Sequence, residues 1–312
     1  MKIAFLADSL DSFKTYKDTT YSMMIEAGQR GHSVHAFDLA DMALDGGVVV
    51  ANIAPVTLTG DPDDWYRLEL RAPQQLDTYD VIVVRKDPPF DMEYVYATYL
   101  LELAQQTGAR IVNQPQAIRD HNEKLAIARF PQFIAPTLVS RDMARLRAFH
   151  TAHQDVIFKP LDGMGGTGVF RIGTDGQNLG TVLEMLSDNG RRTIMAQRFI
   201  PEITQGDKRI LLIGGKVVPF ALARIPQNGE VRGNLAAGGL GVAQALSARD
   251  LEIAETLAPI LFQRGLLLVG LDVIGGYLTE VNVTSPTCFQ EIRQQQGFNV
   301  AAMFVDALEQ AV

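Results

Sequence analysis

A run of six residues, Gly163-Met164-Gly165-Gly166-Thr167-Gly168, constrains the fold of this chain more than any other stretch. It contains four glycines and matches the G-x-G-x-x-G pattern of dinucleotide-binding loops. In those loops a helix begins directly after the last glycine, so that the pyrophosphate meets the helix N-terminus. Here the strand-like segment Val169–Ile172 follows instead. We therefore expect a loop between two antiparallel strands whose backbone N–H groups fold over nucleotide phosphates; an ordinary hairpin turn is the simpler alternative.

The order of strand-like and helical segments predicts two kinds of architecture. In the first third, apolar strand-length runs alternate with helical patterns, which is typical of an open α/β sheet. The strands expected there are Lys2–Ala7, Ser33–Phe37, Asp80–Arg85 and Arg110–Asn113, with helices at 18–31 and 93–106 and an exposed hairpin from Val48–Ala51 and Pro55–Thr59. From about His121 the pattern changes to an α+β one with antiparallel pairs. The strands expected there are 155–159, 169–172, 193–199, 208–213, 216–224, 266–274 and 277–283, with helices at 248–264 and from Asn299.

Composition excludes several classes of protein. The single cysteine, Cys288, allows no internal disulfide and no cysteine-based zinc site, which is typical of a reducing cytoplasm. The apolar run at the amino terminus stops at Asp8, too early for a signal peptide or a membrane span. The net charge is −8 and no lysine or arginine cluster is present, so nucleic acid and membranes are not expected as partners. We expect a small-molecule substrate.

Basic residues occur where a nucleotide-binding loop needs them. Lys159 ends the strand before the glycine run, where its ammonium suits phosphate oxygens. Arg209 and Arg224 flank one apolar hairpin, and Arg232 follows it. Surface salt bridges are the simpler explanation, but three arginines around one hairpin of an acidic protein favour an anionic ligand and a transferring phosphoryl group. The segment 228–241 holds five glycines and is expected to form a mobile lid that excludes water.

Three oxygen-bearing residues near the carboxyl terminus are typical of a site for a hard cation. Glu280 and Asn282 alternate along one expected strand and so share a face, and Asp272 lies in the preceding strand. Such oxygens suit Mg²⁺, which also takes nucleotide phosphates as ligands. A strict two-residue turn at Gly275-Gly276 would pair Asp272 with Thr279 and turn it away from Glu280. The metal hypothesis therefore predicts a three-residue loop or a glycine bulge. The alternative hypothesis, that these acidic residues only make the turn soluble, requires neither.

In chain order, the lysines, the glycine loop, the arginines and the carboxylate cluster resemble an ATP-grasp ligase, and longer blocks resemble the bacterial glutathione synthetase family. These blocks are 85–91 (RKDPPFD), 122–124 (NEK), 159–166 (KPLDGMGG), 232–239 (RGNLAAGG) and 279–287 (TEVNVTSPT). With the first strand and its helix, they extend over nearly the whole chain. The implied fold is an open parallel-sheet (pre-ATP-grasp) domain at 1–120, followed by a two-lobed ATP-grasp module with lobes at 121–200 and 201–312.

The resemblance implies an ATP-dependent ligation of γ-glutamylcysteine to glycine that yields glutathione, ADP and phosphate. In that family the cysteinyl carboxylate attacks the γ-phosphate, and the amine of glycine then attacks the resulting acyl phosphate, so the enzyme needs no nucleophile. The cofactors implied are ATP and Mg²⁺, as two ions, with Mn²⁺ as a possible substitute. The family also implies a homo-oligomer, either a tetramer or a dimer.

The resemblance also assigns roles to individual positions. Lys124, Lys159 and the glycines would bind the ATP phosphates, the backbone at 197–200 would line the adenine pocket, and Asp207 would lie near the ribose. The residues so implied for ATP are Lys124, Lys159, Gly163, Gly165, Gly166, Gly168, Gln197, Phe199, Ile200 and Asp207. Asp272, Glu280 and Asn282 would bind the metal, and Arg209 and Arg224 would be catalytic, stabilising the acyl phosphate and the tetrahedral intermediate. Arg85, Arg232, Ser285 and Thr287 would bind the peptide and glycine.

The chain departs from the family pattern at Leu240, where the lid often has a basic residue, and at Arg198, where the hinge has a smaller polar one. Three alternative functions stay open. The first is a related ligase for other amino acids or peptides. The second is a dinucleotide-dependent oxidoreductase, which a strand after Gly168 would exclude. The third is a catalytically silent nucleotide-binding regulator, which would not need Arg209 and Arg224.

Overall fold

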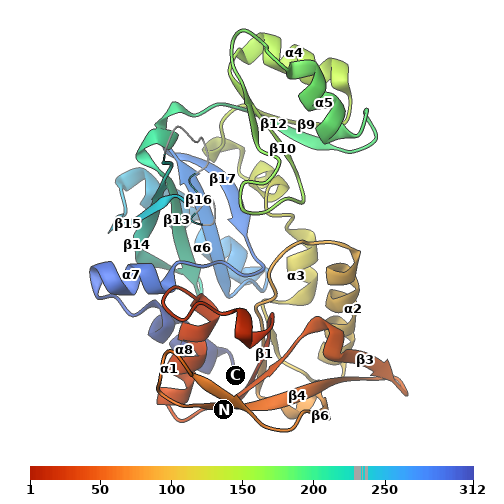
Figure 1. Ribbon diagram of the computed structural model, residues 1–312, viewed down its shortest axis with the longest axis vertical. Coiled ribbons are helices and arrows are strands. Elements are labelled where there is room, and N and C mark those ends of the chain that lie inside the picture. The colour runs from red at the N-terminus through yellow and green to blue at the C-terminus, as the bar shows by residue number, and fades with distance from the viewer. Residues whose placement is uncertain (228–232, 234, 236–237) are drawn as a thin grey trace.

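The computed structural model describes residues 1–227, 233, 235 and 238–312. Its framework consists of β-sheets that follow one another along the chain. The first sheet has the strand order β3-β4-β2-β1-β7-β8, with β5 and β6 also paired to β4. The second has the order β11-β10-β12-β9 and the third β15-β14-β13-β16-β17. In Figure 1 the first sheet lies at the bottom, the third in the middle and the second at the top.

The first sheet is a parallel α/β sheet at its centre, as predicted. Its strands are β1 (Lys2–Leu6), β2 (Ser33–Phe37), β3 (Met42–Asp45), β4 (Val48–Leu58), β5 (Tyr66–Leu68), β6 (Ala72–Gln75), β7 (Val81–Val84) and β8 (Ile111–Val112). Its helices are α1 (Thr19–Gln29), α2 (Met92–Gln106) and α3 (Pro115–Asp120), with short 3₁₀ segments η1 (Leu10–Ser12), η2 (Leu39–Asp41) and η3 (Leu76–Thr78). The neighbours β2, β1, β7 and β8 run parallel. Helix α1 begins where expected because the side chain of Asp18 accepts a hydrogen bond from the N–H of Tyr21.

The exposed hairpin expected from Val48–Ala51 and Pro55–Thr59 is wrong. Both segments belong to the single strand β4, whose first half pairs with β3 and β6 and whose second half pairs with β2 and β5. Pro55 does not break the strand because a proline removes only one backbone donor, while its carbonyl still accepts a hydrogen bond from the N–H of Glu69. Much of β4 is buried.

The remaining sheets are antiparallel, as predicted. The second consists of β9 (Thr137–Ser140), β10 (Val156–Pro160), β11 (Phe170–Ile172) and β12 (Ile194–Arg198), with α4 (Met143–His153) and α5 (Leu179–Ser187). The third consists of β13 (Asp207–Ile213), β14 (Lys216–Ile225), β15 (Leu240–Ala245), β16 (Leu268–Ile274) and β17 (Tyr277–Asn282), with α6 (Ala248–Gln263), α7 (Phe289–Gln296) and α8 (Val300–Ala311). The connecting 3₁₀ segments are η4 (Leu125–Arg129), η5 (Pro131–Phe133) and η6 (Pro201–Gln205). None of the helices in the described part of the chain is long and apolar enough to cross a membrane.

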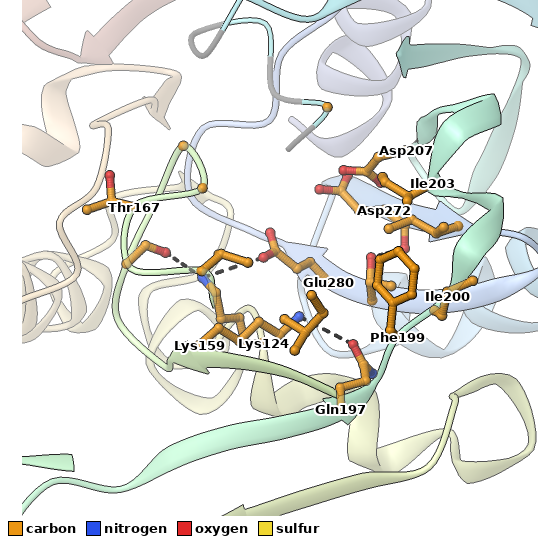
Figure 2. A pocket seen from close by; sticks show the side chains of 18 of the residues that line it. Lys124, Lys159, Thr167, Gln197, Phe199, Ile200, Ile203, Asp207, Asp272 and Glu280 are labelled. Atoms are coloured by element: carbon orange, nitrogen blue, oxygen red, sulfur yellow. Dashed lines mark hydrogen bonds and ion pairs between the residues drawn. The ribbon is translucent and has the colours of Figure 1, made fainter. Parts of the chain in front are cut away.

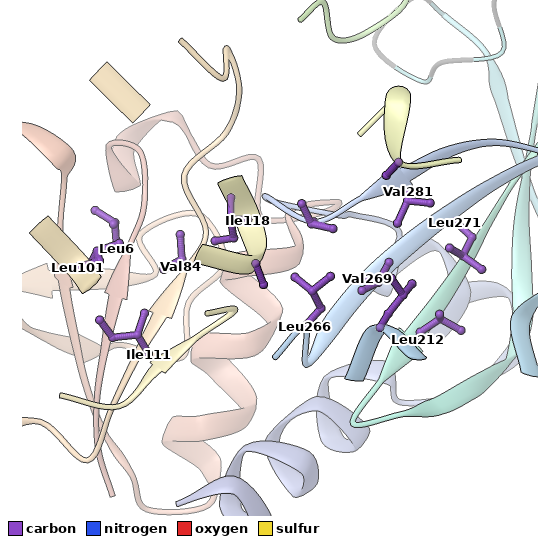
Figure 3. Close-up of a cluster of buried hydrophobic side chains, with 14 of the residues drawn as sticks. Leu6, Val84, Leu101, Ile111, Ile118, Leu212, Leu266, Val269, Leu271 and Val281 are labelled. Atoms are coloured by element: carbon purple, nitrogen blue, oxygen red, sulfur yellow. The ribbon is translucent and has the colours of Figure 1, made fainter. Parts of the chain in front are cut away.

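The hydrophobic core joins the first and third sheets. Figure 3 shows Leu6, Val84 and Ile111 on one side and Val269 and Leu271 on the other, within one cluster of buried side chains. A second cluster also includes residues of both sheets. By contrast, most buried residues of the second sheet form a cluster with α4 and α5 alone. We propose 1–120, 121–200 and 201–312 as structural units; each sheet falls within one of these ranges.

Candidate active site

A cleft between the second and third sheets contains most of the residues predicted to bind ATP. It holds about 820 Å³ of space, part of it open to solvent, which lies in the range of roughly 300–1,000 Å³ typical of small-molecule sites. The predicted residues that line it are Lys124, Lys159, Gly163, Gly165, Gly166, Gln197, Phe199, Ile200 and Asp207. Gly168 belongs to the same loop, although it is not part of the cleft lining. Figure 2 shows the lysines and Glu280 toward one end and Phe199, Ile200 and Ile203 toward the other.

The glycine loop connects β10 to β11, which are antiparallel neighbours. A strand therefore follows Gly168, and this excludes the dinucleotide-binding loop of an oxidoreductase. Gly165, Gly166 and Gly168 have φ values of 62°, 80° and 73°, in the left-handed region that residues with a Cβ rarely adopt. The loop thus needs glycine for its conformation. The N–H groups of Gly165, Gly166 and Gly168 donate to no carbonyl of the described chain, which leaves them available for an anion.

Two buried lysines lie at the loop end of the cleft. The ammonium of Lys124 donates a hydrogen bond to the carbonyl oxygen of Gly163 and lies 3.5 Å from Oε1 of Glu280. The ammonium of Lys159 lies 3.4 Å from Oε1 of Gln197, and burial lowers the pKa of Lys159. The partner of Lys159 is therefore a neutral amide, and an anion beside it would stabilise the charged form.

The other end of the cleft is mostly apolar. Phe199, Ile200 and Ile274 line it. Arg198, the departure from the family pattern at the hinge, also lines this end, and its Nη2 donates a hydrogen bond to the hydroxyl of Tyr277 at 3.3 Å. Arg198 thus connects the second sheet to the third across the cleft. An apolar end opposite two ammonium groups matches a nucleotide, which has an aromatic base at one end and phosphates at the other.

The strands β16 and β17 bring the predicted carboxylates onto one face. Asp272 pairs with Glu280, whereas Val273 pairs with Leu278, so an extra residue at Thr279 forms a bulge. The predicted common face of Asp272 and Glu280 is confirmed, but the bulge that produces it lies at Thr279 and not at a glycine, and the turn keeps two residues. Without this bulge, the two-residue Gly275-Gly276 turn would place Asp272 opposite Thr279.

Buried ion pairs hold Asp272 between two arginines. Nη2 of Arg209 lies 3.1 Å and Nη2 of Arg224 lies 2.8 Å from Oδ2 of Asp272, and Arg224 also pairs with Asp207. Burial alone would raise the pKa of Asp272, but the two guanidinium groups hold it well below its ordinary value. Burial, reinforced by the charge of Asp272, raises the pKa of Asp207 to about 7 in spite of Arg224. The simpler hypothesis of surface salt bridges is therefore wrong for Arg209 and Arg224.

The carboxylates fit a magnesium ion only in part. Both oxygens of Asp272 accept hydrogen bonds from arginines. Nδ2 of Asn282 donates to the carbonyl oxygen of Gly270, so Oδ1 is the atom left for a cation. Within the described ranges, no group of three or more histidine, cysteine, aspartate or glutamate side chains is arranged to hold a metal on its own. Mg²⁺ bound with nucleotide phosphates needs only one or two protein carboxylates, and Glu280 with Asn282 fits that pattern better than Asp272 does.

A second cavity of about 850 Å³ adjoins the first. The two share Gly163, Gly165 and Glu280 in their linings. The predicted catalytic and substrate-binding residues found in its lining are Arg209, Arg224, Ser285 and Thr287, together with Asn282. Arg85 is buried, donates a hydrogen bond to the hydroxyl of Thr20, and is not part of the described lining of either cavity. Arg232 lies outside the described residues, as does much of the predicted lid; Leu240 is exposed at the start of β15.

Sequence analysis missed two carboxylates of the second cavity, Asp87 and Glu123. The hydroxyl of Ser285 donates a hydrogen bond to Oδ1 of Asp87, although 198 positions separate these residues. Oε1 of Glu123 accepts three hydrogen bonds, from the N–H of Val283 and from the N–H and hydroxyl of Thr284. For Asp87 a signal exists, because it follows a strand of a parallel sheet at the carboxyl edge, where ligands of open α/β folds bind.

Comparison with known proteins places the chain among the glutathione synthetases. The model for the prokaryotic glutathione synthetase N-terminal domain matches residues 1–119, and that for the ATP-grasp domain matches residues 123–297. A glutathione synthetase from Ralstonia nicotianae is 63% identical over 311 residues, covering 100% of this chain and 96% of that protein. One from Neisseria meningitidis serogroup B is 57% identical over 312 residues, covering 99% and 98%.

Solved structures with the same fold are much more distant in sequence. The D-cycloserine synthetase DcsG superimposes with a TM-score of 0.70 at 16% identity, covering 99% of this chain and 100% of that one. The ATP-grasp ligase PsnB, complexed with minimal precursor, Mg and ADP, gives a TM-score of 0.63 at 17% identity, covering 99% and 97%. These likenesses show the fold alone and confirm the predicted ATP-grasp architecture. Since the two domain models and the relatives cover nearly the whole length, the chain belongs to the prokaryotic glutathione synthetase family of ATP-dependent ligases.

Proposed function

We propose that this chain joins γ-glutamylcysteine to glycine at the expense of ATP, giving glutathione, ADP and phosphate. The observation that carries the proposal is the junction of the two cavities at Gly163, Gly165 and Glu280. A γ-phosphate held in the first cavity reaches a carboxylate held in the second only through such a junction. The family membership supports the choice of substrates.

In the first step, the cysteinyl carboxylate attacks the γ-phosphorus and ADP leaves. We assign Lys124, Lys159 and the N–H groups of the glycine loop to the phosphates, because these groups gather at the junction end of the cleft. Mg²⁺, which ATP-grasp ligases bind generally, neutralises phosphate charge when bound. We place it on Glu280 and Asn282. We also propose that two ions bind, that Asp272 takes part in binding them, and that Mn²⁺ can replace Mg²⁺. Turnover measured as a function of the concentration of each metal tests these three points.

In the second step, the amine of glycine attacks the acyl carbon and phosphate leaves. Negative charge develops first on the acyl phosphate and then on the tetrahedral intermediate. Arg209 and Arg224 line the second cavity and are held rigidly by Asp272 and Asp207, so they can stabilise that charge without reorganising. We propose Thr287 and the backbone N–H of Ser285 for the substrate carboxylates, since both residues line this cavity and the hydroxyl of Ser285 already donates to Asp87.

The decisive experiment is to measure ADP release with ATP and Mg²⁺ while omitting γ-glutamylcysteine and glycine in turn. We expect release to need both, with glutathione as the product. Release with other acceptors would keep the ligase and reassign its substrate. ATP binding without turnover would instead favour the catalytically silent regulator. We further propose that the protein is a homo-oligomer, either a tetramer or a dimer, which light scattering after size-exclusion chromatography measures. We also propose a cytoplasmic location, which cell fractionation tests.

A further inference from the structure

We propose that Asp87 binds the α-ammonium group at the glutamyl end of the dipeptide, an inference that rests on the proposed function. Asp87 lies three residues after β7, at the carboxyl edge of the first sheet, and its side chain lines the second cavity. The hydroxyl of Ser285 donates a hydrogen bond to its Oδ1 and so orients the carboxylate from the opposite domain. The phosphoryl-transfer chemistry leaves this carboxylate without a role.

Elimination among the acidic residues of the second cavity favours Asp87. Its lining contains three carboxylates, Asp87, Glu123 and Glu280. Glu280 lies at the junction and faces Lys124. Glu123 already accepts three hydrogen bonds on Oε1, which fix it to the loop that follows β17. Oδ2 of Asp87 has no hydrogen-bond or ion-pair partner among the described residues, and the residue is exposed to the cavity.

The charges of the substrate match this arrangement. γ-Glutamylcysteine has two carboxylates and one ammonium group, and the ammonium lies at the end opposite to the carboxylate that is phosphorylated. That carboxylate must lie near Glu280 and the arginines. Ser285 is five residues from Glu280, which is at most about 17 Å of extended chain, whereas the extended dipeptide spans roughly 10 Å, or three residue lengths. The length of chain between Glu280 and Ser285 is therefore compatible with a dipeptide that spans the cavity with its ammonium at the Asp87–Ser285 pair.

Such a contact makes the enzyme selective for the glutamyl group. A site that binds a charged group through a carboxylate rejects an analogue that lacks the group, because the carboxylate is then desolvated without a partner. The test compares γ-glutamylcysteine with glutarylcysteine, which differs only by lacking the α-amino group. We expect the wild-type protein to prefer γ-glutamylcysteine by about ten- to a hundredfold in kcat/KM.

The test variant is Asp87→Asn, whose side-chain oxygen can still accept the hydrogen bond from Ser285. We expect it to lose kcat/KM for γ-glutamylcysteine about ten- to a hundredfold and to change by less than about twofold with glutarylcysteine, so the preference disappears. The KM for glycine and for ATP should not change. Asp77→Asn, which removes an exposed carboxylate of the same domain, is the control with the same change in net charge.

Equal losses of kcat/KM with γ-glutamylcysteine and glutarylcysteine would overturn the proposal, because they would mean that Asp87 only supports the local structure. A rise confined to the KM for glycine would also overturn the proposal, because Asp87 would then bind the amino group of glycine. Failure of the proposed function is distinguishable from both: the wild-type protein would then join glycine to neither γ-glutamylcysteine nor glutarylcysteine, and calorimetry with a non-hydrolysable ATP analogue and Mg²⁺ would detect no binding of γ-glutamylcysteine.

Discussion

Replacing Asp272 with alanine removes a carboxylate that Arg209 and Arg224 share. The side chains of Asp272, Arg209 and Arg224 are only 3%, 8% and 6% exposed, so water cannot take its place. Arg224 keeps its ion pair with Asp207, but Arg209 has no other carboxylate within 4 Å in the described part of the chain. Because removing one partner of a buried ion pair leaves a charge uncompensated, we expect the free energy of unfolding to fall by about 3–5 kcal/mol at pH 7.

Urea unfolding followed by the fluorescence of Trp65 measures this loss. Trp65 is the only tryptophan and lies in a buried cluster shared by the first and third sheets. The matched control is Glu252→Ala in α6, which also removes a carboxylate from an arginine, at 2.8 Å from Arg249. The Glu252 side chain is 57% exposed, and we expect its removal to cost less than about 1 kcal/mol.

The reasoning would be refuted if Asp272→Ala and Glu252→Ala lost similar stability with an unchanged dependence on urea. That outcome would mean that Arg209 and Arg224 find other partners, or that their charges are solvated in the folded protein. An altered urea dependence would indicate a change in the denatured state and would call for a double-mutant cycle with Arg209.

Three further predictions concern the same cleft. Since Arg209 and Arg224 hold the folded-state pKa of Asp272 below the unfolded value of about 3.9, its ion pairs stabilise the protein above that pH, and the stability difference from Asp272→Asn should shrink as the pH falls below about 4; a difference that stays constant as the pH falls through this range would contradict this. Glu280→Ala should lower turnover about a hundredfold or more, and unchanged ADP release at saturating Mg²⁺ would disprove its role. Lys159→Ala should raise the KM for ATP about ten- to a hundredfold, and an unaltered KM would exclude a phosphate contact.

Features determined by neighbouring residues could be predicted from the sequence. The strand Ser33–Phe37 was predicted with the bounds observed, since Gly31 and the apolar alternation define it locally. The need for an irregular pairing followed from requiring that Asp272 and Glu280 share a face, although the observed bulge lies at Thr279 and not at a glycine. The glycine loop could be placed because its conformation needs residues without a Cβ, whatever surrounds it.

Features that depend on distant pairing could not be predicted. The strand β4 changes partners halfway, and only the assembled sheet shows that Pro55 lies within it. The ion pairs of Asp272 depend on β13 lying beside β16, where Arg209 is directly opposite Asp272. The contact between Asp87 and Ser285 joins two domains, and no local pattern specifies which serine lies nearby.

The division of the hydrophobic core has a mechanical consequence for the cleft. The side-chain amide of Asn113 forms hydrogen bonds with the backbone of Leu268 and Val283 and so adds to the contacts of the shared core. The first and third sheets are therefore packed together as one body. The second sheet, apart from Met195 and Val139, has a core of its own and packs separately. Lys159 and the glycine loop lie on the side of the cleft formed by the second sheet, whereas Glu280 lies on the side that belongs to the shared core. A bound triphosphate would therefore lie between two separately packed bodies, and a change in their separation would leave Arg209 and Arg224 in place beside Asp272.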